Sequence, residues 1–69
     1  MPRRRVAYLT GRQIRQLREH RRESMEKFAS HFLRHRGTVH RWESGRPPTC
    51  GGDLVILLAM WRRAGFPPP

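Results

Sequence analysis

Apolar side chains recur at helical spacing in four separate stretches of the chain. In the first stretch, Ile14 and Leu17 form a narrow apolar stripe among arginines, which predicts an amphipathic helix over residues 11–22. Thr10 and Gln13 stand three residues apart at its start, as in a capping box, where each side chain bonds the backbone of the other residue. The sequence therefore predicts a capped first helix with one buried face.

The second stretch begins at Ser24, a residue type that caps helix N-termini. Phe28, Ala29 and Phe32 follow at the spacing of one helix face, and the pattern ends near Phe32 or Leu33. The small side chain of Ala29 between two phenylalanines indicates a close crossing with a neighbouring helix. This stretch predicts a short second helix that is held by aromatic side chains.

The third stretch is a short helix from about Arg36 to Ser44. Its Val39 and Trp42 are spaced to face inward, and Gly45 is the residue type that most often ends a helix. Two inward residues are enough to hold such a helix against a small core. The remaining faces are left to cations and small side chains.

The fourth stretch follows a proline-containing loop and opens at Thr49 or Cys50. Its body, residues 54–61, is apolar on more than one face, and Gly65 ends it. No stretch alternates with the period of a strand and no segment repeats. We therefore expect an all-α fold, a compact domain of four or five helices.

A chain of 69 residues has room for one domain with a single small core. We expect a basic arm over residues 1–9, a helical domain over residues 10–65 and a proline-rich tail over residues 66–69. Cys50 is the only cysteine, so no disulfide can support the core. Stability then has to come from helix packing, from dimerisation or from both.

Nothing in the sequence predicts a membrane partner. The basic start is followed by too few apolar residues for a secretory signal, and the apolar run from Leu54 to Trp61 is too short to span a bilayer. A lone cysteine also fits a reducing compartment. We expect a cytoplasmic protein, in the bacterial nucleoid or in the cytoplasm of a phage-infected host.

The net charge of the chain is the strongest indication of its partner. Fifteen lysines and arginines, all but one of them arginine, face five acids and give a net charge of +10. GC-rich coding can explain arginine in place of lysine, but it does not explain the shortage of acids. A guanidinium can fork onto a phosphate or a guanine edge, so the charge favours nucleic acid as the partner. The arm residues Arg3, Arg4 and Arg5 fit the minor groove or a merely solubilising role equally well.

One motif is specific enough to suggest a family. It reads Thr38-Val39-His40-Arg41-Trp42-Glu43-Ser44-Gly45 and is followed by Arg46-Pro47-Pro48. Phe28-Ala29 stands fourteen residues upstream of Trp42-Glu43. These residues resemble the lambda-repressor-like (Cro/C1-type, XRE) family of DNA-binding domains, over roughly residues 10–63. The resemblance implies a helix-turn-helix at about residues 24–45, whose second helix lies in the major groove of double-stranded DNA.

The resemblance also implies roles for individual residues. Base-reading roles fall on the outer face of the third helix, at Arg36, Gly37, Thr38, His40 and Arg41. Phosphate contacts are expected from the cations around it, Arg46, Lys27, Arg12 and Arg34. Arg36 is suited to grip a guanine with two hydrogen bonds. Gly37 fits either a close approach of the backbone to DNA or a plain helix start after a loop.

Three positions depart from the family pattern. Leu33 stands where the family has a turn glycine, a position that often needs a left-handed backbone, which costs a leucine about 1–2 kcal/mol. The alternative is that the second helix runs longer. His35 replaces the serine that caps the next helix, and Met25 replaces a glutamine that holds a phosphate. Arg34 could take over that phosphate contact.

Glu43 is an acid within an otherwise DNA-facing motif. Its matching residue in the family tends to bond internally, so we expect Glu43 to pair with an arginine of the first helix, Arg15 or Arg18. Such a pair would connect the first and third helices.

The fourth helix is apolar over too wide an arc for one buried face. We expect a two-fold homodimer with Val55, Met60, Trp61 and Phe66 at the seam. The alternative is that these residues all line the core of one chain. A dimer predicts an inverted repeat in the DNA, with half-site centres about one helical turn apart.

Other classes of function have less support. No nucleophile–base arrangement or glycine-rich phosphate loop is present, so we expect neither an enzyme nor a cofactor or small-molecule ligand. His31, His35 and His40 lack a cysteine or acid that would complete a metal site. RNA binding is disfavoured because no sheet with exposed aromatics is predicted.

The sequence therefore predicts a sequence-specific double-stranded-DNA-binding transcriptional regulator. The expected form is a small homodimeric repressor, acting on its own promoter in a phage or mobile-element operon. The alternative from another class is an antitoxin or inhibitor module that masks a protein partner.

Overall fold

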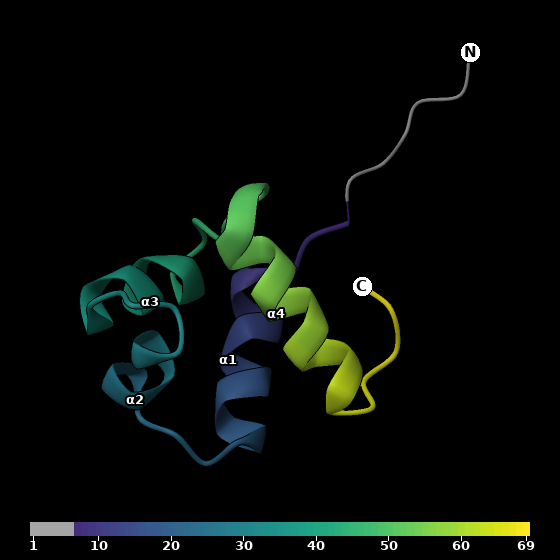
Figure 1. Ribbon diagram of the computed structural model, residues 1–69, viewed down its shortest axis with the longest axis horizontal. Helices are drawn as coiled ribbons and strands as arrows, with labels where there is room; N and C mark the ends of the chain where they lie inside the picture. Colours follow the sequence, from purple (N-terminus) through teal and green to yellow (C-terminus); the bar gives the residue numbers. More distant parts are fainter. Residues whose placement is uncertain (1–6) are drawn as a thin grey trace.

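The fold is known from a computed structural model that describes residues 7–69, so Arg3, Arg4 and Arg5 of the predicted arm lie outside the described residues. Within residues 7–69 there is no strand, and the helices in chain order are α1 (Gly11–His20), α2 (Met25–Ser30), α3 (Arg36–Glu43) and α4 (Gly51–Arg63). Helix α1 lies between the α2–α3 pair on one side and α4 on the other (Figure 1). The predicted all-α fold is confirmed.

The core forms where the inner faces of the four helices meet. Its buried apolar residues are Leu9, Ile14, Leu17, Phe28, Ala29, Phe32, Val39, Trp42, Leu57 and Trp61. Phe32 meets the ring of Trp42 edge to face, with 5.2 Å between the ring centroids. This aromatic contact joins the turn after α2 to α3. Val39 and Trp42 are both buried, so the prediction that they anchor the third helix is confirmed.

Both predicted N-caps are present. The Thr10 side chain accepts a bond from the Gln13 backbone at 3.2 Å, and the Gln13 side chain accepts one from the Thr10 backbone at 2.9 Å. The Ser24 hydroxyl accepts the Lys27 backbone N–H at 3.1 Å at the start of α2. These bonds satisfy N–H groups that a helix start leaves without partners, which fixes where α1 and α2 begin.

Gly11 opens α1 against the end of α3. A Cβ atom at this position would lie 2.6 Å from the Trp42 carbonyl oxygen and 2.7 Å from that of Glu43. Backbone atoms cannot move aside as a flexible side chain can. The absence of a side chain at Gly11 is therefore what allows α1 and α3 to cross so closely.

Two helices end through a left-handed residue that is not glycine. Leu33 has φ 56°, and the bonds Arg34 N–H to Ala29 O (3.1 Å) and Leu33 N–H to Ser30 O (3.2 Å) form a Schellman motif after α2. Of the two alternatives for this position, Leu33 adopts the left-handed conformation itself, and α2 does not run longer. Arg22, with φ 55°, ends α1 in the same way. The first helix therefore stops at His20, two residues earlier than the sequence predicted.

The C-terminal segment packs back onto α4. The Trp61 indole N–H donates to the Pro67 carbonyl oxygen at 2.6 Å, and the Phe66 ring stacks on the Trp61 ring at 4.3 Å. Trp61 is only 4% exposed. It therefore belongs to the core of one chain, and the prediction that Trp61 is available at a dimer seam is wrong.

Candidate nucleic-acid interface

Helix α3 separates into an inner and an outer face. Val39 and Trp42 are buried, whereas the side chains at positions 36, 40 and 41 point to solvent together with Gly37. Thr38 is half-buried beside them, and its hydroxyl accepts a bond from the Arg41 guanidinium at 3.4 Å. The five residues with predicted base-reading roles thus occupy one accessible side of α3.

This side of α3 continues into two adjoining hollows. The first is lined by Met25, Arg36, Gly37 and His40. The second runs toward α1 and is lined by Arg15, Arg18, Met25, His40, Glu43 and Ser44. Met25 and His40 belong to both, so the two hollows adjoin each other between α1, α2 and α3, with arginines in the lining of each.

Met25 was missed as a site residue because the sequence placed it only as a replacement for glutamine. The first residue of α2 gives no periodic signal that tells a solvent-facing methionine from a core one. In the structure it is half-buried, packs against the core and also lines both hollows. Its thioether supplies an apolar, adaptable contact in the middle of a cationic surface.

Gly37 is not required by the packing of the chain. Apart from the backbone of its own helix, no atom lies within 4 Å of the position where a Cβ would be, and its φ is not in the left-handed region. A glycine inside a helix costs about 1 kcal/mol relative to alanine. Because neither space nor backbone geometry demands it, Gly37 weakens α3 at an exposed position without an internal reason.

Glu43 braces α3 against α1 through Arg18. The Arg18 Nε lies 2.7 Å from Glu43 Oε2 and the Arg18 Nη2 lies 3.1 Å from Oε1, which makes the pair bidentate. The Arg18 Nη1 also donates to the Glu23 carbonyl oxygen at 3.0 Å. The hydrogen bond to Glu43 raises the pKa of Arg18, outweighing the opposite effect of burial. The predicted pairing is confirmed for Arg18, while Arg15 pairs with Glu19 instead.

Most of the acids are already used inside the molecule. Four of the five acidic residues form ion pairs, namely Glu19, Glu23, Glu43 and Asp53, with Arg15, Arg21, Arg18 and Arg34 respectively. Within residues 7–69, no acid pairs with Arg36, Arg41 or Arg46. The outer side of α3 therefore keeps its positive charge for an external anion.

The residues predicted to contact phosphates differ in how free their side chains are to do so. Arg46 is exposed directly after Gly45 (φ 115°), where a Schellman motif ends α3 with a 3.0 Å bond from Arg46 N–H to the Arg41 carbonyl. Lys27 and Arg12 are exposed near the starts of α2 and α1. Arg34 instead reaches Asp53 at 3.3 Å, which draws its guanidinium toward the start of α4.

His35 precedes α3 as its N-cap residue. Its backbone is extended, and its side chain makes no capping hydrogen bond. The first N–H groups of α3 therefore lack a side-chain acceptor from His35. They lie beside the exposed Arg36 and Gly37, at the helix end where the dipole favours an anion.

The residues predicted at a dimer seam differ in exposure. Val55 and Ile56 of α4 are 67% and 39% exposed, whereas Met60 and Phe66 are half-buried and Trp61 is in the core. Ala59, one turn after Val55, is also exposed. The accessible apolar face of α4 is therefore Val55, Ile56 and Ala59, which is narrower than the sequence suggested.

The histidines considered as metal ligands do not come together on one helix face. His31 bonds Glu23 at 2.8 Å, and His35 and His31 flank the turn between α2 and α3 instead of sharing a helix face. In the part of the chain that the structure describes, no three metal-ligating side chains gather. None of the helices described there has the length and apolarity that crossing a bilayer requires.

Comparison of the chain with models of protein families, with curated proteins and with solved structures gives no match.

Proposed function

We propose that the protein is a sequence-specific regulator that binds double-stranded DNA through α2, the following turn and α3, used as a helix-turn-helix. The observation that carries the proposal is the division of α3. Val39 and Trp42 hold one face in the core, and the opposite side offers Arg36, Gly37 and His40 to solvent with no acid among them. A major groove about 12 Å wide admits a helix presented in this way.

In this proposal the outer residues of α3 have different tasks. Arg36, in the first turn, donates two hydrogen bonds to a guanine edge, a contact worth roughly 1–3 kcal/mol of discrimination between bases. Gly37 lets the backbone of α3 approach the groove floor. Arg46, Lys27 and Arg12 contact phosphates, which adds affinity without base preference. Arg34 contributes less because Asp53 already neutralises it.

We propose further that two copies associate through α4. The exposed face of Val55, Ile56 and Ala59 is the apolar surface available for this, with Met60 and Phe66 beside it. A two-fold dimer reads an inverted repeat, and occupying such an operator at its own promoter represses transcription. The molecular mass from light scattering at tens of micromolar tests the dimer. The wild type should have the mass of a dimer and Val55→Asp that of a monomer. A wild type that stays monomeric at these concentrations contradicts the proposal.

The experiment that tests DNA binding begins with selection of bound duplexes from random sequence. The selected duplex and a scrambled one are then titrated with the wild type, Arg36→Ala and Arg62→Ala. Both variants lose one positive charge, but Arg62 lies at the far end of α4. Arg36→Ala should lower the preference for the selected duplex about 5- to 150-fold, the equivalent of 1–3 kcal/mol. The proposal fails if the two variants behave alike.

A second function is favoured by the exposed apolar face of α4. Val55 at 67% exposure fits a module that masks a protein partner, as an antitoxin or an inhibitor does. The two functions are separated by the same selection. Enrichment of a common duplex sequence supports the DNA-binding function, while no enrichment together with loss of a captured protein in Val55→Asp supports masking.

A further inference from the structure

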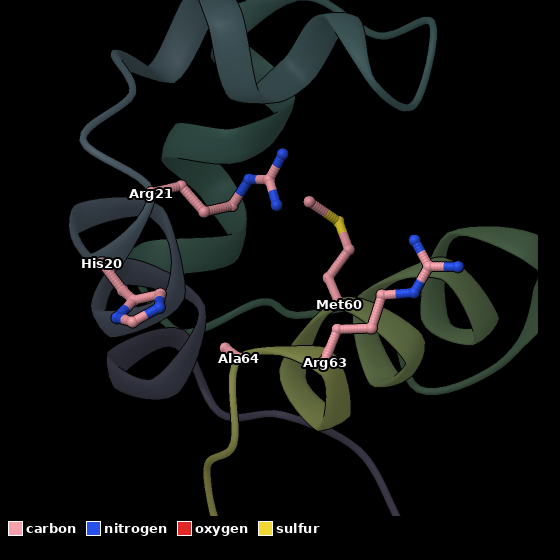
Figure 2. A pocket seen from close by; sticks show the side chains of 5 residues that line it. All are labelled: His20, Arg21, Met60, Arg63 and Ala64. Atoms are coloured by element: carbon pink, nitrogen blue, oxygen red, sulfur yellow. The ribbon is translucent and has the colours of Figure 1, made fainter.

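A second cationic hollow lies away from α3, where the C-terminal ends of α1 and α4 come together. Its volume is about 330 Å³, and its lining residues are His20, Arg21, Met60, Arg63 and Ala64. Figure 2 shows the guanidinium groups of Arg21 and Arg63 on either side of the Met60 side chain, with His20 on the α1 side. In Figure 1 the C-terminal end of α4 lies on the other side of α1 from α3.

The hollow carries an excess of positive charge. Glu23 accepts a hydrogen bond from the Arg21 Nε at 3.0 Å and also bonds His31 at 2.8 Å, but it does not line the hollow. Within residues 7–69, Arg63 pairs with no acid. The dipoles of two helix C-termini favour cations here, but each supplies only about half an elementary charge.

The walls are held by packing against the core. The His20 ring meets the Phe66 ring edge to face at 5.2 Å, and Phe66 in turn stacks on the buried Trp61. Arg21 is fixed at its Nε by Glu23, which leaves its terminal nitrogens to face the hollow. The site is therefore built on two helix ends and not on a loop.

We infer that this hollow binds a phosphate group, independently of the α3 surface. Its volume equals that of about ten water molecules at ~30 Å³ each, which is enough for a phosphate ester with part of its organic group. Guanidinium groups match phosphate oxygens in a forked geometry, and the two arginines suit a group with more than one charge. The apolar floor of Met60 and Ala64 accepts the organic part.

Within residues 7–69, side chains of the same chain do not fill the hollow with an acid. Four of the five acids form internal ion pairs, and the fifth, Glu26, lies on α2. The phosphate has two possible sources, a small phosphate ester or the backbone of a single-stranded nucleic acid. Both present the same oxygens to Arg21 and Arg63.

The test uses NMR of the full chain, titrated with inorganic phosphate and, separately, with a tetranucleotide that carries no terminal phosphate. Sodium chloride at matched ionic strength is the control. Saturable shifts of the His20 ring and the Arg63 side chain are expected with at least one of the two ligands. A response to phosphate alone assigns a small ester, and a response to the tetranucleotide identifies backbone phosphates.

Adjacent variants provide the matched comparison. Arg63→Ala removes a cation from the hollow and should weaken binding roughly tenfold, since a charge-assisted bond is lost. Arg62→Ala removes the same charge one residue earlier, on the side of Leu58 and Pro68, and should change binding less than about twofold. Shifts reproduced by chloride, or equal effects of the two variants, overturn the inference. Neither result depends on α3, so DNA binding there stands or fails separately.

Discussion

Arg18 of α1 and Glu43 of α3 are joined by two hydrogen bonds, of 2.7 and 3.1 Å, and their side chains are only 14% and 6% exposed. Breaking a pair of this kind leaves the other charge without compensation in a poorly solvated place. Glu43→Ala should therefore lower the free energy of unfolding by roughly 3 kcal/mol, as measured by urea titration with tryptophan fluorescence. The exposed pair Arg15–Glu19 is the control, and Glu19→Ala should cost less than about 0.5 kcal/mol. Similar losses in both variants would contradict the bracing role.

Gly11 marks the closest approach of α1 to α3. In Gly11→Ala the new Cβ starts 2.6 Å from the Trp42 carbonyl oxygen, so the helices have to separate. The free energy of unfolding should fall by roughly 1–3 kcal/mol, the usual cost of overpacking. Gln16→Ala, at an exposed position of the same helix, is the control and should change stability little. A neutral Gly11→Ala would show that the crossing has room to spare.

Local patterns predicted much of this structure, and long-range contacts account for the rest. The caps at Thr10 and Ser24 follow from neighbouring residues and were expected, whereas the left-handed Leu33 was only one of two possibilities, beside a longer second helix. Gly11 was not, because its importance depends on a carbonyl 31 positions away along the chain, at Trp42. The pairing of Arg34 with Asp53 depends likewise on how α4 is placed.

Exposure of the fourth helix was also only partly predictable. Its apolar run indicated more surface than one core needs, but periodicity could not say which residues the C-terminal segment covers. Phe66 and Pro67 cover Trp61, and Val55 remains exposed. A contact made by residues beyond the helix thus decided which apolar side chains remain available.

Leu33 combines a left-handed backbone with an almost fully exposed side chain (93%). A left-handed backbone costs a leucine about 1–2 kcal/mol. Glycine removes this strain, but its more flexible unfolded chain lowers stability by about 0.4–1 kcal/mol, so only part of the strain energy is gained. Leu33→Gly should raise the free energy of unfolding by about 0.5–1 kcal/mol. Leu33→Ala separates the two features, because it removes the exposed apolar surface and keeps the backbone strain. A gain in Leu33→Ala as large as in Leu33→Gly would assign the effect to the side chain.

Glu23 makes stability depend on pH. Partial burial pushes its pKa up, but hydrogen bonds from His31 and Arg21 outweigh this and hold the pKa below its ordinary value of 4.5. The stabilisation is therefore complete above about pH 4.5 and is lost as the pH falls through the lower folded-state value. Urea titrations at pH 6 and pH 3 should show a smaller loss for Glu23→Gln than for the wild type. Comparing the two proteins at each pH isolates the contribution of the Glu23 carboxylate.

Gly37 allows stability and binding to be separated in one substitution. Its Cβ position is open and its backbone is not left-handed, so Gly37→Ala fits the fold and should stabilise the protein by up to about 1 kcal/mol. The added methyl group lies on the side of α3 that is proposed to enter the major groove, so affinity for the selected duplex should fall although the fold becomes more stable. Thermal unfolding and a DNA titration on the same samples measure both effects. Gly52→Ala, which also points into open space but lies on α4, is the control and should leave DNA affinity unchanged. If Gly37→Ala kept full affinity, the close approach of α3 to the groove floor would be wrong, and Gly37 would be only a helix start after a turn.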